Sequence, residues 1–185
     1  MPIGIDNGVS RAFLQEEFRS INPKMRIPVL GIDNEIITEL PAILTAISKL
    51  APQLNILGSN DMETVRAYEW LNWLSGTLHG QAFGALWRPQ RFTDEPELYD
   101  SLKKRAVVTI RECFSDIEGK LSAAHSVGNS FTVVDAFLLV FWRWGKSIGI
   151  GMEESYPKYS ALASAVLDRD STKAAMETER IASKI

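Results

Sequence analysis

The signals for β-strands are confined to the first third of the chain, and this constrains the fold more than any other feature of the sequence. Residues 27–31 and 35–38 are apolar, β-branched runs separated by Asp33-Asn34, a turn signal that predicts a hairpin. From Asp61 onward the apolar residues recur at helical spacing, with no strand pattern. The sequence therefore predicts a small α/β unit followed by an all-helical unit.

Three further elements are expected in the first unit, which we place at residues 1–54. Residues 2–6 form a short apolar run that predicts a strand, and residues 11–19 carry apolar side chains at the spacing of a short helix. Pro41 suits the first turn of another helix, because the N–H that proline lacks has no helical partner there. Pro52 is expected to close that helix.

Five helices are expected in the second unit, which we place at residues 60–185. The helix over 133–148 is the most hydrophobic and is expected to be central. Thr132 and Asp135 stand at its start with the spacing of a capping box, in which each side chain bonds the backbone N–H of the other residue. The expected helices cover 61–86, 96–121, 133–148, 156–167 and 171–181.

Composition excludes several classes of function. The net charge of −3 gives no electrostatic reason to expect nucleic acid or an anionic membrane as a partner, and no apolar run approaches the length of a membrane span. The first residues lack the pattern of a secretory signal. With one cysteine, Cys113, and two histidines, we expect neither an internal disulfide nor a structural metal site. A cytoplasmic location is expected, with Cys113 as a packing residue.

Two segments together carry a resemblance to a known family. The first runs from Asn22-Pro23 through Ile27-Pro28 to Glu39 and the helix start at Pro41, and the second is the aromatic stretch 69–79. Their order and spacing resemble glutathione S-transferases, closest to the bacterial beta-class pattern. The resemblance implies a thioredoxin-like N-terminal half and an all-α C-terminal domain. Relative to the family, we expect the first strand and helix, which carry its usual catalytic Tyr, Ser or Cys, to have no counterpart.

The resemblance implies a glutathione site that begins at Ile27-Pro28. There the proline would follow a cis peptide bond, and Ile27 would offer its backbone N–H and C=O to the cysteinyl part of glutathione. An ordinary trans proline at the start of an edge strand is the alternative. Lys24 and Arg26 flank the segment, and either is a candidate for the glycyl carboxylate of the tripeptide. A solvated turn with two cations is the alternative for these two side chains.

The same resemblance assigns Glu39 and Leu40 to the γ-glutamyl end of glutathione. Glu39 would hold the ammonium group, and the N-terminus of the following helix would receive the carboxylate, as helix N-termini favour anions. Leu40 departs from the family pattern, which has a serine there, so we expect weakened binding. The alternative is that Glu39 only stabilises the first helical turn.

In the second segment, Asn72 and His79 are seven residues apart, which in an α-helix is about two turns and places them on one face. By resemblance, Asn72 would reach glutathione bound in the partner subunit of a homodimer. His79 would act as the catalytic residue by approaching the thiol. A structural histidine is the alternative. Gly80 stands where the family has a basic residue.

The resemblance also implies a substrate pocket and a reaction. Phe83, Leu86, Trp87 and Arg88 would line the pocket for an apolar electrophile. Glutathione thiolate would add to the substrate, giving conjugation or, if it leaves again, cis–trans isomerisation of a conjugated double bond, as in secondary-metabolite biosynthesis. The alternative function is a non-catalytic binding and dimerisation module.

Overall fold

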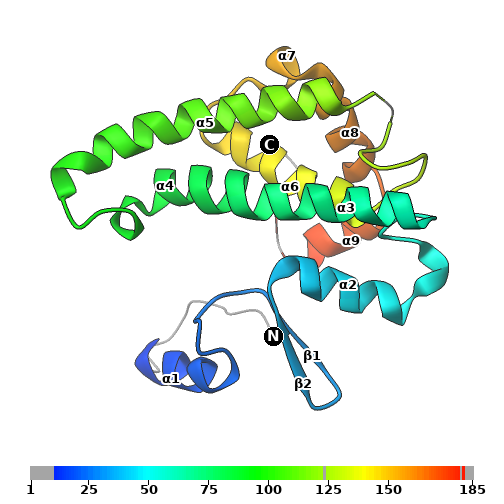
Figure 1. Ribbon diagram of the computed structural model, residues 1–185, viewed down its shortest axis with the longest axis horizontal. Coiled ribbons are helices and arrows are strands. Elements are labelled where there is room, and N and C mark those ends of the chain that lie inside the picture. The colour runs from blue at the N-terminus through cyan, green and yellow to red at the C-terminus, as the bar shows by residue number, and fades with distance from the viewer. Residues whose placement is uncertain (1–10, 123, 180, 182–185) are drawn as a thin grey trace. The chain divides into compact units, whose positions relative to one another are not determined.

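The structure, a computed structural model, describes residues 11–122, 124–179 and 181, with the backbone alone for residues 11–15 (Figure 1). The expected strand over residues 2–6 lies outside the described residues. The chain divides into two compact units, Met1–Leu54 and Asn55–Ile185. The first contains both described strands, and in the second the described elements are all helical.

The described part of the first unit is a helix, a hairpin and a second helix. The hairpin pairs Val29 with Thr38 and Ile32 with Glu35 in antiparallel register, as the β-branched runs predicted. Asp33 in the turn has a φ of 52°, a left-handed conformation that aspartate tolerates better than most residues. The elements are α1 (Arg11–Ile21), β1 (Val29–Ile32), β2 (Glu35–Thr38), α2 (Leu40–Leu50) and the 3₁₀ turn η1 (Pro52–Leu54).

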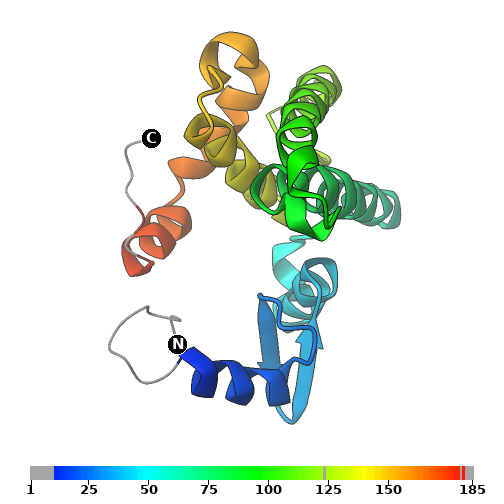
Figure 2. The ribbon, with the colours of Figure 1, turned by 90° about the vertical axis from the view of Figure 1, so that its left-hand side faces the viewer.

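Helix α2 begins directly after β2 and packs against it (Figure 2). Pro41 lies in its first turn and Ile43 is buried, which confirms the predicted start of this helix. The helix ends at Leu50, two residues before Pro52, because a proline disfavours helical geometry in the residue that precedes it.

The second unit begins with a long helical rod that changes geometry in its middle. Asn60 caps α3 (Asp61–Trp73) by accepting a hydrogen bond of 3.0 Å from the Glu63 N–H. The rod continues as η2 (Leu74–Phe83), which is π-helical, and ends as α4 (Gly84–Trp87) before Arg88-Pro89. The prediction of one helix over 61–86 was right in extent, but it missed the π-helical segment.

Helix α6 is the most buried of the remaining helices. Helix α6 packs against α3 and α8, while α5 packs against η2 and α4 (Figures 1 and 2). Each predicted helix is present, and α7 is an additional short one. The elements that follow α4 are η3 (Pro89–Arg91), η4 (Pro96–Leu98), α5 (Tyr99–Lys120), α6 (Val133–Ser147), α7 (Met152–Ser155), α8 (Pro157–Leu167) and α9 (Asp170–Thr178). Of the described helices, none combines the length and apolar character needed to cross a membrane.

The core of the second unit is aromatic and closely packed around Gly145 on α6. A Cβ atom at Gly145 would lie 2.6 Å from Met152 Sδ and 2.7 Å from Phe114 Cε2, so only glycine fits this helix contact. Tyr159 is completely buried and donates a hydrogen bond of 2.6 Å to the Leu138 carbonyl oxygen. Burial raises the pKa of this phenol well above its ordinary value, so it remains a neutral donor.

The start of α6 has the predicted capping box and an additional attachment. Asp135 Oδ2 accepts the Thr132 N–H at 2.8 Å, and the two residues bond reciprocally. The other oxygen, Oδ1, accepts the Ser126 N–H at 2.8 Å and the Ser126 hydroxyl at 2.6 Å. The carboxylate is fully buried. It therefore joins the helix N-terminus to the preceding segment, which the capping pattern alone did not predict.

Candidate functional site

The first group of predicted site residues lies on the turn that leads from α1 to β1. Asn22 is buried; its Nδ2 donates to the Arg26 carbonyl oxygen at 2.6 Å, and its Oδ1 accepts the Lys24 N–H at 3.1 Å. These bonds fix the backbone just before Ile27. The Ile27–Pro28 peptide bond is cis, as the resemblance implied, and the Ile27 side chain is 69% exposed.

Glu39 occupies the junction between β2 and α2 and is paired with Lys24. The Lys24 ammonium donates to Glu39 Oε1 and, at 2.7 Å, to Thr38 Oγ1. The hydrogen bond to Glu39 and the positive charge of Lys24 lower the pKa of the Glu39 carboxyl below its ordinary value, with a smaller contribution from Arg26. The carboxylate is therefore ionised at neutral pH, and its position already accommodates an ammonium group.

The backbone at Glu39 is in an uncommon conformation. Its φ is 70° and its ψ is 121°, whereas non-glycine residues rarely adopt a positive φ. Such conformations persist where surrounding contacts hold them, and they cluster at ligand-binding sites. Glu39 directly precedes α2. The first N–H groups of that helix, at Leu40 and Ala42, have no carbonyl partner within the helix. A carboxylate side chain and the positive end of a helix thus lie next to each other.

The second group of predicted site residues lies on the α3–η2 rod of the other unit. Asn72 and His79 are both exposed. The expectation that they share a face assumed α-helical rotation throughout, but π-helical geometry begins at Leu74, between them. Since i→i+5 bonding turns each residue through a smaller angle, seven residues no longer correspond to two turns. The His79 ring instead lies 5.5 Å from the ring of Trp144 on α6.

The predicted substrate-pocket residues differ in their surroundings. Phe83 is completely buried, with its ring 4.9 Å from that of Trp87, so it packs in the core rather than at a surface. Leu86 is half-buried, while Trp87 is 45% exposed and Arg88 is exposed. Trp144, one of the aromatic residues in which this chain is rich, packs edge-on against Trp87, with 4.8 Å between the ring centroids. It extends the aromatic surface from α4 to α6.

The predicted site residues therefore fall into two groups, one in each unit. Lys24, Arg26, Ile27, Pro28, Glu39 and Leu40 gather in the first unit, and Asn72, His79, Leu86, Trp87 and Arg88 line the rod of the second. Sequence reasoning missed Asn22, which organises the first group. The Asn-Pro pair that marks this turn was the signal available to find it. Within the described residues, no three potential metal ligands cluster.

Comparison with known proteins supports the assignment of the fold. Residues 80–170 match the family model for the glutathione S-transferase C-terminal domain. The chain is 28% identical over 141 residues to glutathione S-transferase GstA of Escherichia coli O157:H7. That alignment covers 75% of this chain and 66% of the relative, just under two thirds of its length.

Two solved structures are similar over most of the chain. A bacterial beta-class glutathione S-transferase from Sphingomonas chungbukensis has a TM-score of 0.76 and 29% identity, covering 89% of this chain and 79% of its own. A sphingomonad glutathione S-transferase complexed with glutathione has a TM-score of 0.77 and 28% identity, with the same coverage. The family match, the relatives and the two-unit architecture agree with the sequence motifs. The chain is similar to glutathione S-transferases, and its helical unit matches the model of their C-terminal domain.

Proposed function

We propose that the protein is a glutathione-dependent enzyme that adds the thiolate of glutathione to an electrophilic carbon of an apolar substrate. The match of residues 80–170 to the C-terminal domain of glutathione S-transferases supports this proposal, as does the similarity to a sphingomonad glutathione S-transferase that was solved as a complex with glutathione. The observation that carries it furthest is the junction at Glu39, where an ionised carboxylate adjoins the N-terminus of α2. This arrangement suits a ligand that bears an ammonium and a carboxylate on one carbon.

In this proposal the γ-glutamyl end of glutathione binds at Glu39. Its ammonium takes the place that the Lys24 ammonium now occupies, and its carboxylate accepts hydrogen bonds from the N–H groups at the start of α2. Ile27, whose side chain is exposed just before the cis Pro28, pairs its backbone with the cysteinyl residue. Arg26, and Lys24 once displaced, meet the glycyl carboxylate.

His79 is the proposed hydrogen-bond partner of the thiolate. Its imidazole is exposed, and an imidazole nitrogen can take a proton from a thiol or donate a hydrogen bond to a thiolate. In the proposed homodimer, Asn72 of the partner subunit contacts the bound tripeptide. The apolar substrate lies against Leu86, Trp87 and Arg88.

Thiolate addition can have two chemical outcomes. In conjugation the sulfur–carbon bond remains, and the electron pair displaces a leaving group or takes up a proton. In isomerisation the thiolate adds to a conjugated double bond, the resulting single bond rotates, and the thiolate leaves unchanged. Incubation with a conjugated electrophile distinguishes them, because a product that retains glutathione indicates conjugation. A geometric isomer formed without net consumption of glutathione indicates isomerisation, the form suited to secondary-metabolite biosynthesis.

A non-catalytic binding and dimerisation module is the second candidate function. The Lys24–Glu39 pair favours it, because a carboxylate that already has a cation partner must exchange that partner before it binds glutathione. Leu40 supports it further, since it supplies no hydroxyl group at the helix start. Such a module would remain a dimer by sedimentation but would bind glutathione weakly or not at all.

Calorimetric titration with glutathione tests the proposal. Glu39→Gln removes the charge while keeping the shape of the side chain, so binding should weaken about tenfold or more, as expected for a charged hydrogen bond. Glu35→Gln, an exposed carboxylate on the same hairpin, is the matched control and should bind as the wild type does. Equal affinity of all three proteins would contradict the proposed site. No binding by the wild type would favour the non-catalytic module.

A further inference from the structure

The ammonium group of Lys24 is bonded within the protein at the place where the ammonium of glutathione is proposed to bind. Lys24 Nζ donates to Glu39 Oε1 and, at 2.7 Å, to Thr38 Oγ1. The side chains of the ion pair are open to water, 49% exposed for Lys24 and 65% for Glu39. An exposed pair of this kind is weak, so a ligand can displace it without a change in the fold.

Lys24 can leave Glu39 without leaving the site. Its backbone is held in the turn, because the Lys24 N–H donates to Asn22 Oδ1 at 3.1 Å and Asn22 is buried. Its side chain is long and half exposed, so rotation about its own bonds is enough to move the ammonium. The displaced charge then stays near Ile27, the residue whose backbone is proposed to pair with the tripeptide.

A displaced Lys24 finds no second carboxylate near Glu39 on the hairpin. The other acidic side chains of the hairpin, Asp33 and Glu35, lie at its turn, at the opposite end from Glu39. The Lys24 hydrogen bond and charge are the main causes of the lowered pKa of Glu39, and Arg26 adds a smaller one. Once Lys24 is displaced, its positive charge adds to that of Arg26, and an anion of the ligand would be attracted to both.

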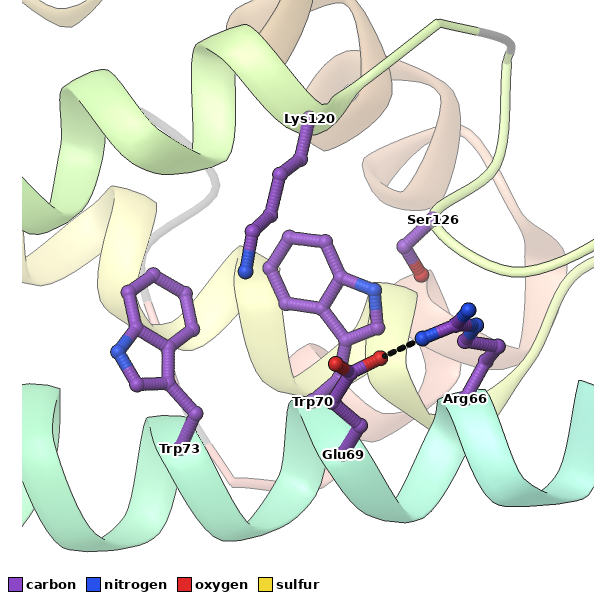
Figure 3. Close-up of a pocket in the computed structure, with 6 residues that line it drawn as sticks. All are labelled: Arg66, Glu69, Trp70, Trp73, Lys120 and Ser126. Carbon is purple, nitrogen blue, oxygen red and sulfur yellow. Dashed lines mark hydrogen bonds and ion pairs between the residues drawn. The ribbon is translucent and has the colours of Figure 1, made fainter.

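A second exposed ion pair shows why the position at a helix start matters. Arg66 Nη1 donates to Glu69 Oε2 at 2.7 Å on α3 (Figure 3). Glu69 lies in the interior of that helix, where the backbone N–H groups are already bonded, so a ligand carboxylate would find no donors beside it. Glu39, in contrast, adjoins the free N–H groups at the start of α2. A group with an ammonium and a carboxylate on one carbon can therefore compete with Lys24.

We propose that Lys24 makes the site selective for ligands that carry an anion at the end opposite the γ-glutamyl group, as the glycyl carboxylate of glutathione does. This inference rests on the glutathione site proposed above. A ligand without the distal anion breaks the Lys24–Glu39 pair and leaves Lys24 without a partner. A ligand with the distal anion supplies a new partner, so one ion pair is exchanged for two. The selectivity comes from the charge left unpaired in the wrong complex.

The C-terminal amide of glutathione is the probe for this exchange, because it keeps the length of glutathione and lacks the glycyl charge. In calorimetric titration, Lys24→Met should bind the amide about two- to fivefold more tightly than the wild type does, which corresponds to the strength of an exposed ion pair. The variant also loses the partner of the glycyl carboxylate, so its preference for glutathione over the amide should shrink. A lysine that only contacted bound glutathione would leave the affinity for the amide unchanged.

Thr38→Val is a second test, which retains the Lys24 charge. Valine keeps the β-branched side chain that suits a strand but removes the Oγ1 acceptor that helps to hold the Lys24 ammonium. The pair with Glu39 should then be displaced more easily, so that glutathione and its amide both bind about twofold more tightly. Unchanged or weaker binding of both ligands by this variant would overturn the proposal.

Lys49→Met is the matched control, because Lys49 is an exposed lysine of the same unit, in the last turn of α2 and away from Glu39. It should bind both ligands as the wild type does. If the wild type binds glutathione but Lys24→Met does not gain affinity for the amide, the exchange is refuted and the site at Glu39 stands. If neither the wild type nor any variant binds either ligand, the proposed glutathione site fails as well. If Lys24→Met does not fold, Thr38→Val decides.

Discussion

Replacing Asp135 with alanine should destabilise the helical unit more than replacing Thr132, its partner in the capping box. The Asp135 carboxylate is fully buried and accepts the Thr132 N–H and, from Ser126, both the N–H and the hydroxyl. In the alanine variant the two backbone donors lose their partner, whereas the hydroxyl of half-buried Ser126 can turn toward water. The loss therefore depends mainly on two backbone N–H groups.

The magnitude follows from these two donors. A buried donor left without a partner costs about 1–3 kcal/mol, so two cost roughly 2–6 kcal/mol. Removing the carboxylate also relieves the cost of burying its charge, which offsets part of this loss. We expect a net loss of about 3 kcal/mol, compared with about 1 kcal/mol for Thr132→Ala, which removes only the other half of the capping box.

Urea denaturation followed by circular dichroism measures the difference. With a slope of about 2 kcal/mol per molar urea, the Asp135→Ala midpoint should fall by about 1.5 M. The control is Asp170→Ala, an exposed aspartate in the first turn of α9, which should cost about 0.5 kcal/mol through the helix dipole alone. If Asp135→Ala costs no more than Asp170→Ala, the buried carboxylate does not hold the start of α6 to the preceding segment.

Three further predictions concern the Cys113 thiol, the helix contact at Gly145 and the Lys24–Glu39 ion pair. Burial and the nearby acidic charges raise the pKa of Cys113 to about 11, so a thiol reagent at pH 8 should label the native protein far more slowly than the urea-unfolded protein; equal labelling rates would contradict this. Gly145→Ala should cost about 2 kcal/mol in urea denaturation because its Cβ overlaps two core side chains, whereas Gly119→Ala, in open space on α5, should be neutral or stabilising. Since Lys24 lowers the pKa of Glu39 below 4.5, their ion pair stabilises the fold above that pH and is lost as the pH falls through the lowered value. Lys24→Met should raise the Glu39 pKa measured by NMR, and an unchanged value would show that the pair does not form in solution.

The pattern of apolar residues predicted most of the fold. The hairpin, the start of α2 at Pro41 and the central position of α6 all follow from local periodicity and turn chemistry. The π-helical segment η2 does not, because its apolar residues are compatible with either helical rotation. Helix α7 is only four residues long, too short to show a period.

The candidate site was predictable where a motif is local and unpredictable where it depends on long-range pairing. The helix start at Glu39 is visible in the sequence, and so is the Asn-Pro turn. The ion pair between Lys24 and Glu39 joins residues fifteen positions apart, so only the folded hairpin reveals it. The burial of Phe83 likewise depends on neighbours from other helices, such as Phe114 and Phe141, that periodicity does not identify.

The most direct test of the proposed glutathione site is to map the backbone amide signals of ¹⁵N-labelled protein during titration with glutathione. We expect saturable shifts at Ile27, Leu40 and Ala42, with much smaller shifts in Glu39→Gln at the same glutathione concentration. If the amide signals of residues 24–42 do not move at saturating glutathione, the proposed site at the start of α2 is contradicted.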